Sequence, residues 1–272
     1  MSKRDSLRID KRFYFNIGVG YNFVSGTGET AQYKEYTNGS FDVTNVKYSY
    51  GKGASLSVAL GKMINKNLGF EVKLGYMGGG KNNHTSTYYD TSSTGDPYAL
   101  EQDFSYFANT FFINPQIVLE APFSQGHALY SKVGYLVGAG KATLALKETP
   151  NFYTIPNQVA QSGEFDWAYT GGLVSGSTLS LGIRLKIDNT ASFFMEATGN
   201  SLHRTFTETH RTKAEKNKQD ILNTFSKYNS EIDFVSTASE PKQIDYNVPR
   251  KEPAYRANYS SAGFRIGFQF YF

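Results

Sequence analysis

The last stretch of the chain, residues 255–272, constrains the fold most. From Ala262 onward its residues alternate between apolar side chains and small or polar ones. The apolar set is Ala262, Phe264, Ile266, Phe268, Phe270 and Phe272, and the intervening set is Gly263, Arg265, Gly267, Gln269 and Tyr271. Successive side chains of a β-strand point to opposite faces, so this period of two predicts a strand with one aromatic face. A strand of a soluble β-sandwich also alternates, and that alternative stays open here.

The same alternation recurs upstream and predicts eight strands in all. They cover residues 12–24, 48–64, 68–77, 104–120, 127–146, 165–187, 191–204 and 255–272. The connections between them alternate in length. Long polar loops are predicted at 25–47, 78–103, 147–164 and 205–254, and short turns at 65–67, 121–126 and 188–190. Within the last loop, the charged stretch 213–228 is compatible with a short surface helix.

This alternation of long and short connections predicts an up-and-down arrangement, because odd connections then lie at one end of the strands and even connections at the other. Long loops at one end and short turns at the other are typical of barrels in the bacterial outer membrane. We therefore predict a single all-β domain over residues 1–272: an eight-stranded antiparallel up-and-down transmembrane β-barrel. It would have long extracellular loops and short periplasmic turns. Lipocalin-like soluble barrels also have eight strands, but their large apolar residues face inward.

Composition agrees with this class and excludes others. The 272 residues include 26 Gly, 20 Tyr and 21 Phe, which is typical of a β-rich, turn-rich chain. No run of 18 apolar residues exists, so a transmembrane helix is excluded, whereas barrel strands give only a weak hydropathy signal. There is no cysteine, which removes disulfides, thiolate metal sites and a thiol nucleophile. A net charge of +4 gives no nucleic-acid footprint.

The aromatic alternation that ends on Phe272 resembles the closing strand of bacterial outer-membrane β-barrels, in particular the small barrels of the OmpA, OmpX and OmpW kind. The resemblance covers the strands and not the loops, whose Tyr, Asn and Lys content resembles that of Bacteroidota proteins. It implies that Phe264, Phe268, Phe270 and Phe272 form the signal read by the barrel assembly machinery. It also implies an outer-membrane location among lipid and lipopolysaccharide.

The N-terminal residues 1–11 are polar and do not form a secretory signal. Because an outer-membrane protein needs one, we expect that the signal has been removed from the given sequence, or that Met1 is an added start. We interpret 1–11 as a periplasmic tail.

Charged residues fall on the inward face of several predicted strands. The interior of an eight-stranded barrel is just wide enough for side chains to fill, so isolated charges there would be costly unless paired. We predict a filled polar lumen without a diffusion pore, and the alternative is a gated ion path. The predicted network comprises Glu71, Lys73, Lys132, Arg184, Glu196 and Arg265.

The histidines are candidate catalytic groups, because some small barrels of this kind modify lipid A and larger ones are proteases or phospholipases. Of His84, His127, His203 and His210, only His203 and His210 lie among the right companions, near Ser201, Glu208 and Thr209. Their spacing matches no known triad. No metal-ligand spacing appears, and the glycine-rich stretch at 75–81 lacks the helix and the Ser or Thr of a phosphate loop.

We therefore expect a non-enzymatic protein without cofactor or metal, whose large outer loops bind a protein partner or form part of a surface complex. The alternatives are a lipid-modifying enzyme that uses His203 and His210, and a transporter for a hydrophobic small molecule.

Overall fold

Strands account for most of the chain. The computed structural model describes residues 13–25, 29–37, 40–91, 97–124, 126–152, 162–239, 241, 243–254 and 256–272. Within these ranges the helical elements are one 3-10 turn, η1 (Leu222–Thr224), and one α-helical turn, α2 (Lys227–Ser230). No helix in the described part is long and apolar enough to cross a membrane. The predicted all-β class is confirmed.

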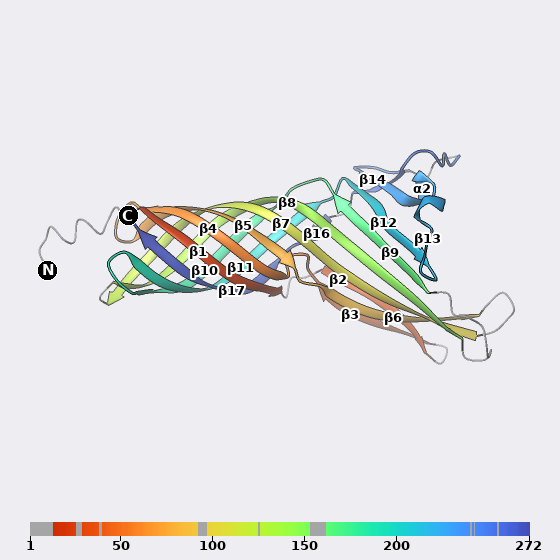
Figure 1. The fold of residues 1–272 in the computed structure, drawn as a ribbon, viewed down its shortest axis with the longest axis horizontal. Helices are drawn as coiled ribbons and strands as arrows, with labels where there is room; N and C mark the ends of the chain where they lie inside the picture. Colours follow the sequence, from red (N-terminus) through yellow and green to blue (C-terminus); the bar gives the residue numbers. More distant parts are fainter. Residues whose placement is uncertain are drawn as a thin grey trace, which may run out of the picture.

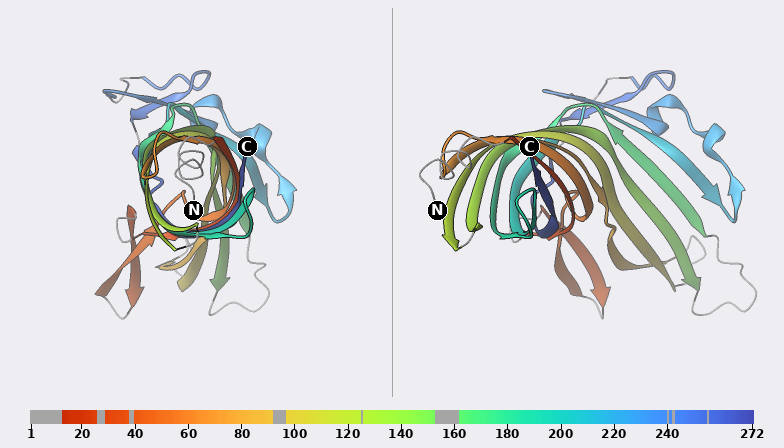
Figure 2. Two further views of the ribbon diagram at one scale, coloured as in Figure 1. Left: turned by 90° about the vertical axis from the view of Figure 1, so that its left-hand side faces the viewer. Right: turned by 60° about the vertical axis from the view of Figure 1, so that its left-hand side comes forward.

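Eight of the strands pair with one another in a closed ring, which Figures 1 and 2 show from the side and end on. Each strand pairs antiparallel with two neighbours, so no ring strand has a free edge there. In order around the ring they are β1 (Phe13–Val24), β4 (Gly53–Met63), β5 (Leu68–Gly79), β7 (Pro97–Ser124), β8 (His127–Phe152), β10 (Val174–Lys186), β11 (Ala191–Thr205) and β17 (Ser261–Tyr271).

The large apolar side chains of the ring lie on its exterior. Along β17, buried and exposed residues alternate, with Phe264 68% exposed and Phe268 45% exposed, and the final Phe272 is 71% exposed. The interior side of the same strand carries Arg265 and Gln269, which are both buried. This strand is therefore apolar on its outer face and polar on its inner face, whereas a strand of a soluble barrel packs its apolar residues inward.

Two ring strands continue far beyond it. β7 has 28 residues and β8 has 26, and their outer halves become the centre of an open sheet that we call the extension. Its other strands are β6 (Asn82–Thr91), β9 (Gly163–Thr170), β12 (Glu208–Lys216), β14 (Glu231–Val235) and β15 (Arg250–Pro253). In Figure 1 the extension runs to the right, away from the ring end that carries the C-terminus.

Two small strands and a separate hairpin complete the description. β13 (Gln219–Asp220) pairs with β12, and β16 (Arg256–Asn258) pairs with β11. A separate two-stranded sheet of β2 (Glu29–Thr37) and β3 (Ser40–Tyr48) lies beside β6. All pairs among the described residues are antiparallel except β14 with β15.

The prediction of eight strands linked by long loops is wrong for the outer half of the chain. The main sheet holds 15 strands, because much of 25–47, 78–103, 147–164 and 205–254 is itself strand. The reason is that β7 and β8 provide long paired edges onto which neighbouring segments add. The predicted periplasmic tail, 1–11, lies outside the described residues.

One finer prediction also fails. The predicted strand 165–187 is two strands, β9 and β10, because Gly171 and Gly172 adopt positive φ values of 73° and 64° between them. The stretch 213–228 holds the short 3-10 turn η1 and the first residues of α2, so its helical content is limited to these short turns. β12 continues to Lys216, and the chain then turns through Asn217 and Lys218, which have φ values of 53° and 67°.

Where β7 and β8 leave the ring, the apolar face of the sheet becomes polar and the polar face becomes apolar. Within the ring, the exterior face of β8 carries Leu129, Val133 and Tyr135, which are 55%, 54% and 52% exposed. Beyond it the same face carries Lys141 and Lys147. The interior face changes in the opposite sense, from buried charged groups to the apolar residues Phe104, Tyr106, Leu144 and Leu146.

Candidate functional site

The middle of the ring interior holds a network of buried charges from four strands. Lys132 of β8 donates to both carboxylate oxygens of Glu71 on β5, at 3.0 and 2.9 Å. The same ammonium lies 3.7 Å from Glu196 of β11, which also binds Arg265 of its neighbour β17. None of the four side chains is more than 8% exposed. They cross-link opposite walls of the ring.

Neutral groups complete this network. The Asn16 side chain donates to Glu71 at 2.8 Å, and the Tyr130 hydroxyl donates to Glu196 at 3.1 Å. The Tyr130 ring lies against Gly182 of the adjacent strand, where a Cβ atom would come within 2.5 Å of Tyr130 Cζ. The glycine therefore makes room for the ring that delivers the hydroxyl to Glu196.

The six residues predicted for this network do not all meet. Glu71, Lys132, Glu196 and Arg265 are brought together, whereas Arg184 pairs with Glu120 nearer the turns. The sequence prediction did not include Glu120. It follows the outward-facing Leu119 at the end of the predicted strand 104–120, so the alternation of side chains indicates that it faces inward. Lys73 is buried at 5% exposure but forms no hydrogen bond or ion pair with the described residues.

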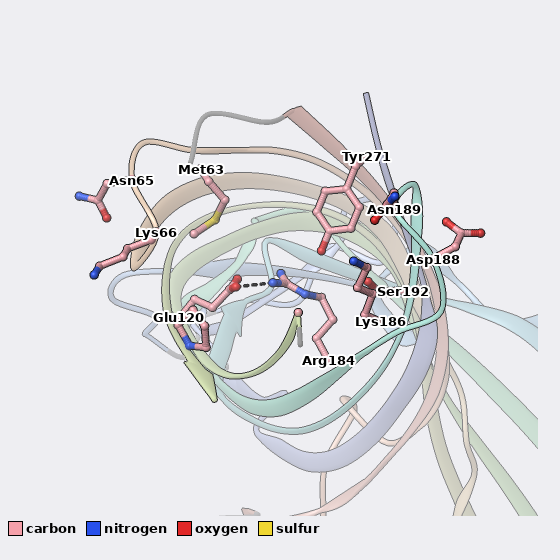
Figure 3. A pocket seen from close by; sticks show the side chains of 12 residues that line it. Met63, Asn65, Lys66, Glu120, Arg184, Lys186, Asp188, Asn189, Ser192 and Tyr271 are labelled. Carbon is pink, nitrogen blue, oxygen red and sulfur yellow. Dashed lines mark hydrogen bonds and ion pairs between the residues drawn. The ribbon is translucent and has the colours of Figure 1, made fainter. Parts of the chain in front are cut away.

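The Arg184–Glu120 pair lies in a pocket of about 160 Å³ at the turn end of the ring. Figure 3 shows the pair between Met63, Tyr271 and Ser192, with Lys186 and Asp188 at the mouth. Three hydrogen bonds from Thr190 and Ala191 lower the pKa of Asp188, and the strongest contributor is the Thr190 backbone N–H. This carboxylate thus closes the β10–β11 turn rather than serving the pocket.

An aromatic cluster fills the ring interior at the opposite end, where the extension begins. Tyr50 and Tyr259 lie with ring centroids 5.4 Å apart, and Tyr50 meets Phe206 edge-on at 6.1 Å. Buried Arg204 donates to the Gly171 carbonyl at 2.9 Å and lies 4.9 Å from the Phe206 ring. This cluster and the charged network thus place buried side chains in the lumen at two levels.

The interior face of the extension is a shelf of partly exposed apolar residues. Phe104 of β7, Leu146 of β8 and Phe165 of β9 are successive cross-strand partners, and Tyr106, Leu144 and Trp167 form the next row. We call these six residues the aromatic shelf.

Arg211 of β12 caps this shelf. Its guanidinium lies 4.0 Å from the Phe225 ring, 4.5 Å from the Trp167 ring and 5.3 Å from the Phe165 ring. Nε and Nη1 are buried and have no hydrogen-bond partner among the described residues. Stacking of the planar guanidinium on aromatic faces is stabilising and does not use its N–H groups. The N–H donors of Arg211 therefore remain available for hydrogen bonds in the plane of the guanidinium.

The histidines do not assemble into a catalytic group. The exposed side chain of His210 and the half-buried one of His203 form no hydrogen bond or ion pair with the described residues. His127 accepts a hydrogen bond from the Lys186 backbone at 3.1 Å in the turns. Burial lowers the pKa of His84 in β6. In the described part of the chain, no cluster of three His, Asp or Glu residues could hold a metal ion. That the chain is not an enzyme stays a prediction.

The residues predicted as the assembly signal, Phe264, Phe268, Phe270 and Phe272, all lie on the ring exterior. Their strand pairs with β1, so the end of the chain closes the ring.

No protein-family model matches this chain, and none of the curated proteins matches it in sequence.

Proposed function

We propose that this chain is an integral β-barrel of the bacterial outer membrane, of the small OmpA-like kind. Its eight ring strands would span the bilayer, its charged lumen would be filled, and its extension would stand in water on the outer side. The role we assign is non-enzymatic: the extension presents a binding surface to a protein partner or forms part of a surface complex.

The observation that carries this proposal is the exchange of face character along β8. One continuous strand has exposed Val133 and Tyr135 on the same side on which Lys141 and Lys147 follow. Soluble proteins rarely expose apolar patches larger than a few hundred Å². An apolar exterior that ends where a charged exterior begins fits a strand that passes from hydrocarbon into water.

The size of the ring supports the same reading. β17 has 11 residues and β1 has 12, and a transmembrane strand needs roughly 9 to 11 residues at its usual tilt. A closed ring also satisfies its backbone hydrogen bonds internally, which hydrocarbon requires of any spanning sheet.

The aromatic shelf is the part of the extension that best suits a partner. Binding surfaces are enriched in Trp, Tyr, Phe and Arg, and Trp167, Phe165 and Arg211 lie together here. Loops were expected to supply this surface, whereas the strands of the extension hold it on a rigid sheet.

A matched pair of substitutions on β8 tests the membrane proposal. Val133→Arg places a cation on the ring exterior, and Ala145→Arg places one on the same face in the extension. An arginine on the lipid-facing side of a barrel strand lowers the free energy of unfolding by about 2–4 kcal/mol at the bilayer midplane. The cost is near zero where the strand lies in water. We expect Val133→Arg to reduce folding into lipid vesicles strongly and Ala145→Arg to fold normally. Equal folding of both variants, or a chain that folds without amphiphile, would refute the proposal.

The partner proposal is tested separately, by purification from membranes in mild detergent. Protein that travels with the wild type should be lost from a Phe165→Ala, Trp167→Ala variant. It should stay with a Glu208→Ala, His210→Ala variant, whose changes lie on the opposite face of the same sheet. Retention by the shelf variant would place the binding surface elsewhere.

A further inference from the structure

The buried charges of the ring do not balance. Among the residues whose burial is described, five cationic and three anionic side chains are buried in it, which leaves an excess of two positive charges. The cations are Lys73, Lys132, Arg184, Arg204 and Arg265, and the anions are Glu71, Glu120 and Glu196. Arg204 lies in the aromatic cluster with a carbonyl and a tyrosine hydroxyl. The remaining imbalance is in the central network, where Lys73 has no carboxylate of its own.

Lys73 lines a small cavity between the charged network and the aromatic cluster. The cavity has a volume of about 40 Å³, and Arg265 lines the same space. Lys73 is 5% exposed and forms no hydrogen bond or ion pair with the described residues. The Arg265 Nε–H is also buried without an acceptor among them, although the Arg265 Nη atoms bind Ser57 and Glu196.

The rest of the lining is uncharged and mostly polar, with Met77, Phe112 and Leu136 as its apolar members. Ser180, Thr178 and Asn114 face the cavity, and no carboxylate lines it. Hydroxyl and amide groups can donate to an anion as readily as to water. A buried charge without a counter-charge is costly, so two cationic donors around one cavity favour an anionic occupant.

We propose that this cavity binds a small monovalent inorganic anion of the size of chloride, held by Lys73 and the Nε–H of Arg265. A cavity needs about 10–15 Å³ to hold one water molecule, so 40 Å³ has room for a chloride. The anion supplies the counter-charge that Lys73 lacks. This inference concerns the lumen alone and does not depend on which membrane holds the ring or on any partner.

Crystals of the wild-type protein grown in bromide locate the anion directly by anomalous scattering. The expected result is one bromide peak within hydrogen-bond distance of Lys73 Nζ and Arg265 Nε. A cavity that holds water only, with no anomalous peak, would overturn the proposal.

Unfolding measurements give an independent readout. The purified protein in detergent is unfolded in chloride and in gluconate at equal ionic strength, because gluconate is too large for the cavity. The wild type and the exposed control variant Lys216→Met should unfold at a higher midpoint in chloride. Lys73→Met should lose this difference, and in gluconate it should be at least as stable as the wild type, because it no longer buries an unpaired charge. A chloride effect that persists in Lys73→Met would contradict the site, and Lys73→Gln repeats the comparison if the methionine variant folds poorly.

Discussion

Asn109 of β7 and Lys141 of β8 are direct cross-strand partners, and both are exposed on the exterior of the sheet. Toward the turns their strands carry Phe111 and Ala139 at the next exterior positions, which are also partners. Tyr76 of β5 donates its hydroxyl to Asn109 at 2.6 Å, so the polar level continues to the neighbouring strand. If the ring spans a bilayer, this level marks the outer interface, where tyrosine is commonly found.

Removing one carboxylate from the lumen should destabilise the ring strongly. Glu196→Gln leaves Arg265 and Lys132 without their shared counter-charge. Breaking a buried pair in this way costs about 3–5 kcal/mol. Urea unfolding in lipid vesicles, followed by the fluorescence of Trp167, measures the change, and the exposed Glu208→Gln serves as the control. A loss as small as that of the control would show that water solvates the network.

The contact between Gly182 and Tyr130 should be intolerant of a methyl group. Gly182→Ala forces the Tyr130 ring away from Glu196, because the new Cβ would lie 2.5 Å from Tyr130 Cζ. Overpacking of this kind costs about 1–3 kcal/mol. Gly199→Ala is the matched control, since its Cβ would meet nothing within 4 Å. The two variants should separate clearly in the same unfolding assay, and equal midpoints would refute the account.

The pKa of Glu164 should depend on Lys213. Lys213 donates a hydrogen bond to Glu164 on the exterior face of the extension, which lowers the pKa of that carboxyl below its usual value. The pair therefore stabilises the fold above the unfolded-state pKa of glutamate, about 4.3, and this contribution is lost as pH falls through the lower folded-state pKa.

Lys213→Met should raise the pKa of Glu164, as measured by NMR titration of its carboxyl carbon. Because the two side chains are 35% and 44% exposed, solvent screens the pair, and the change in the free energy of unfolding should be small. Lys216→Met, further along the same strand, should leave the titration unchanged.

The wild-type protein should not conduct ions in a planar bilayer. The charged network and the aromatic cluster around Tyr50, Phe206 and Tyr259 both cross the lumen, and the interior of an eight-stranded ring is just wide enough for side chains to fill. A general porin in the same bilayer provides the positive control. Steady conductance would favour the alternative of a gated ion path or a transporter.

The sequence pattern identified the ring better than the extension. Alternation placed Phe264 outside and Arg265 inside, because β17 keeps one polarity per face from end to end. It could not show that Lys132 would meet Glu71, since these residues are 61 positions apart and only the closure of the ring joins them.

The extension was missed because its face pattern is inverted. Phe104, Leu144 and Leu146 lie on the face of β7 and β8 that carries polar residues within the ring. A search that assigns apolar residues to the same face along a whole strand therefore ends the strand where they begin. The sequence also does not reveal the break between β9 and β10 at Gly171 and Gly172. Glycine is frequent throughout the ring strands, and these two are recognised as a break only by their positive φ values in the structure.

β7 and β8 remain paired from Tyr98 with Phe152 down to Pro122 with Ala128, without a change of register. The two strands therefore join the ring to the extension without a hinge. A partner bound to the extension would keep a fixed orientation relative to the ring axis. A force that pulls the extension along the strand axis would act parallel to β7 and β8. It would load many backbone hydrogen bonds between the two strands at once, in shear, and the ring would anchor the strands.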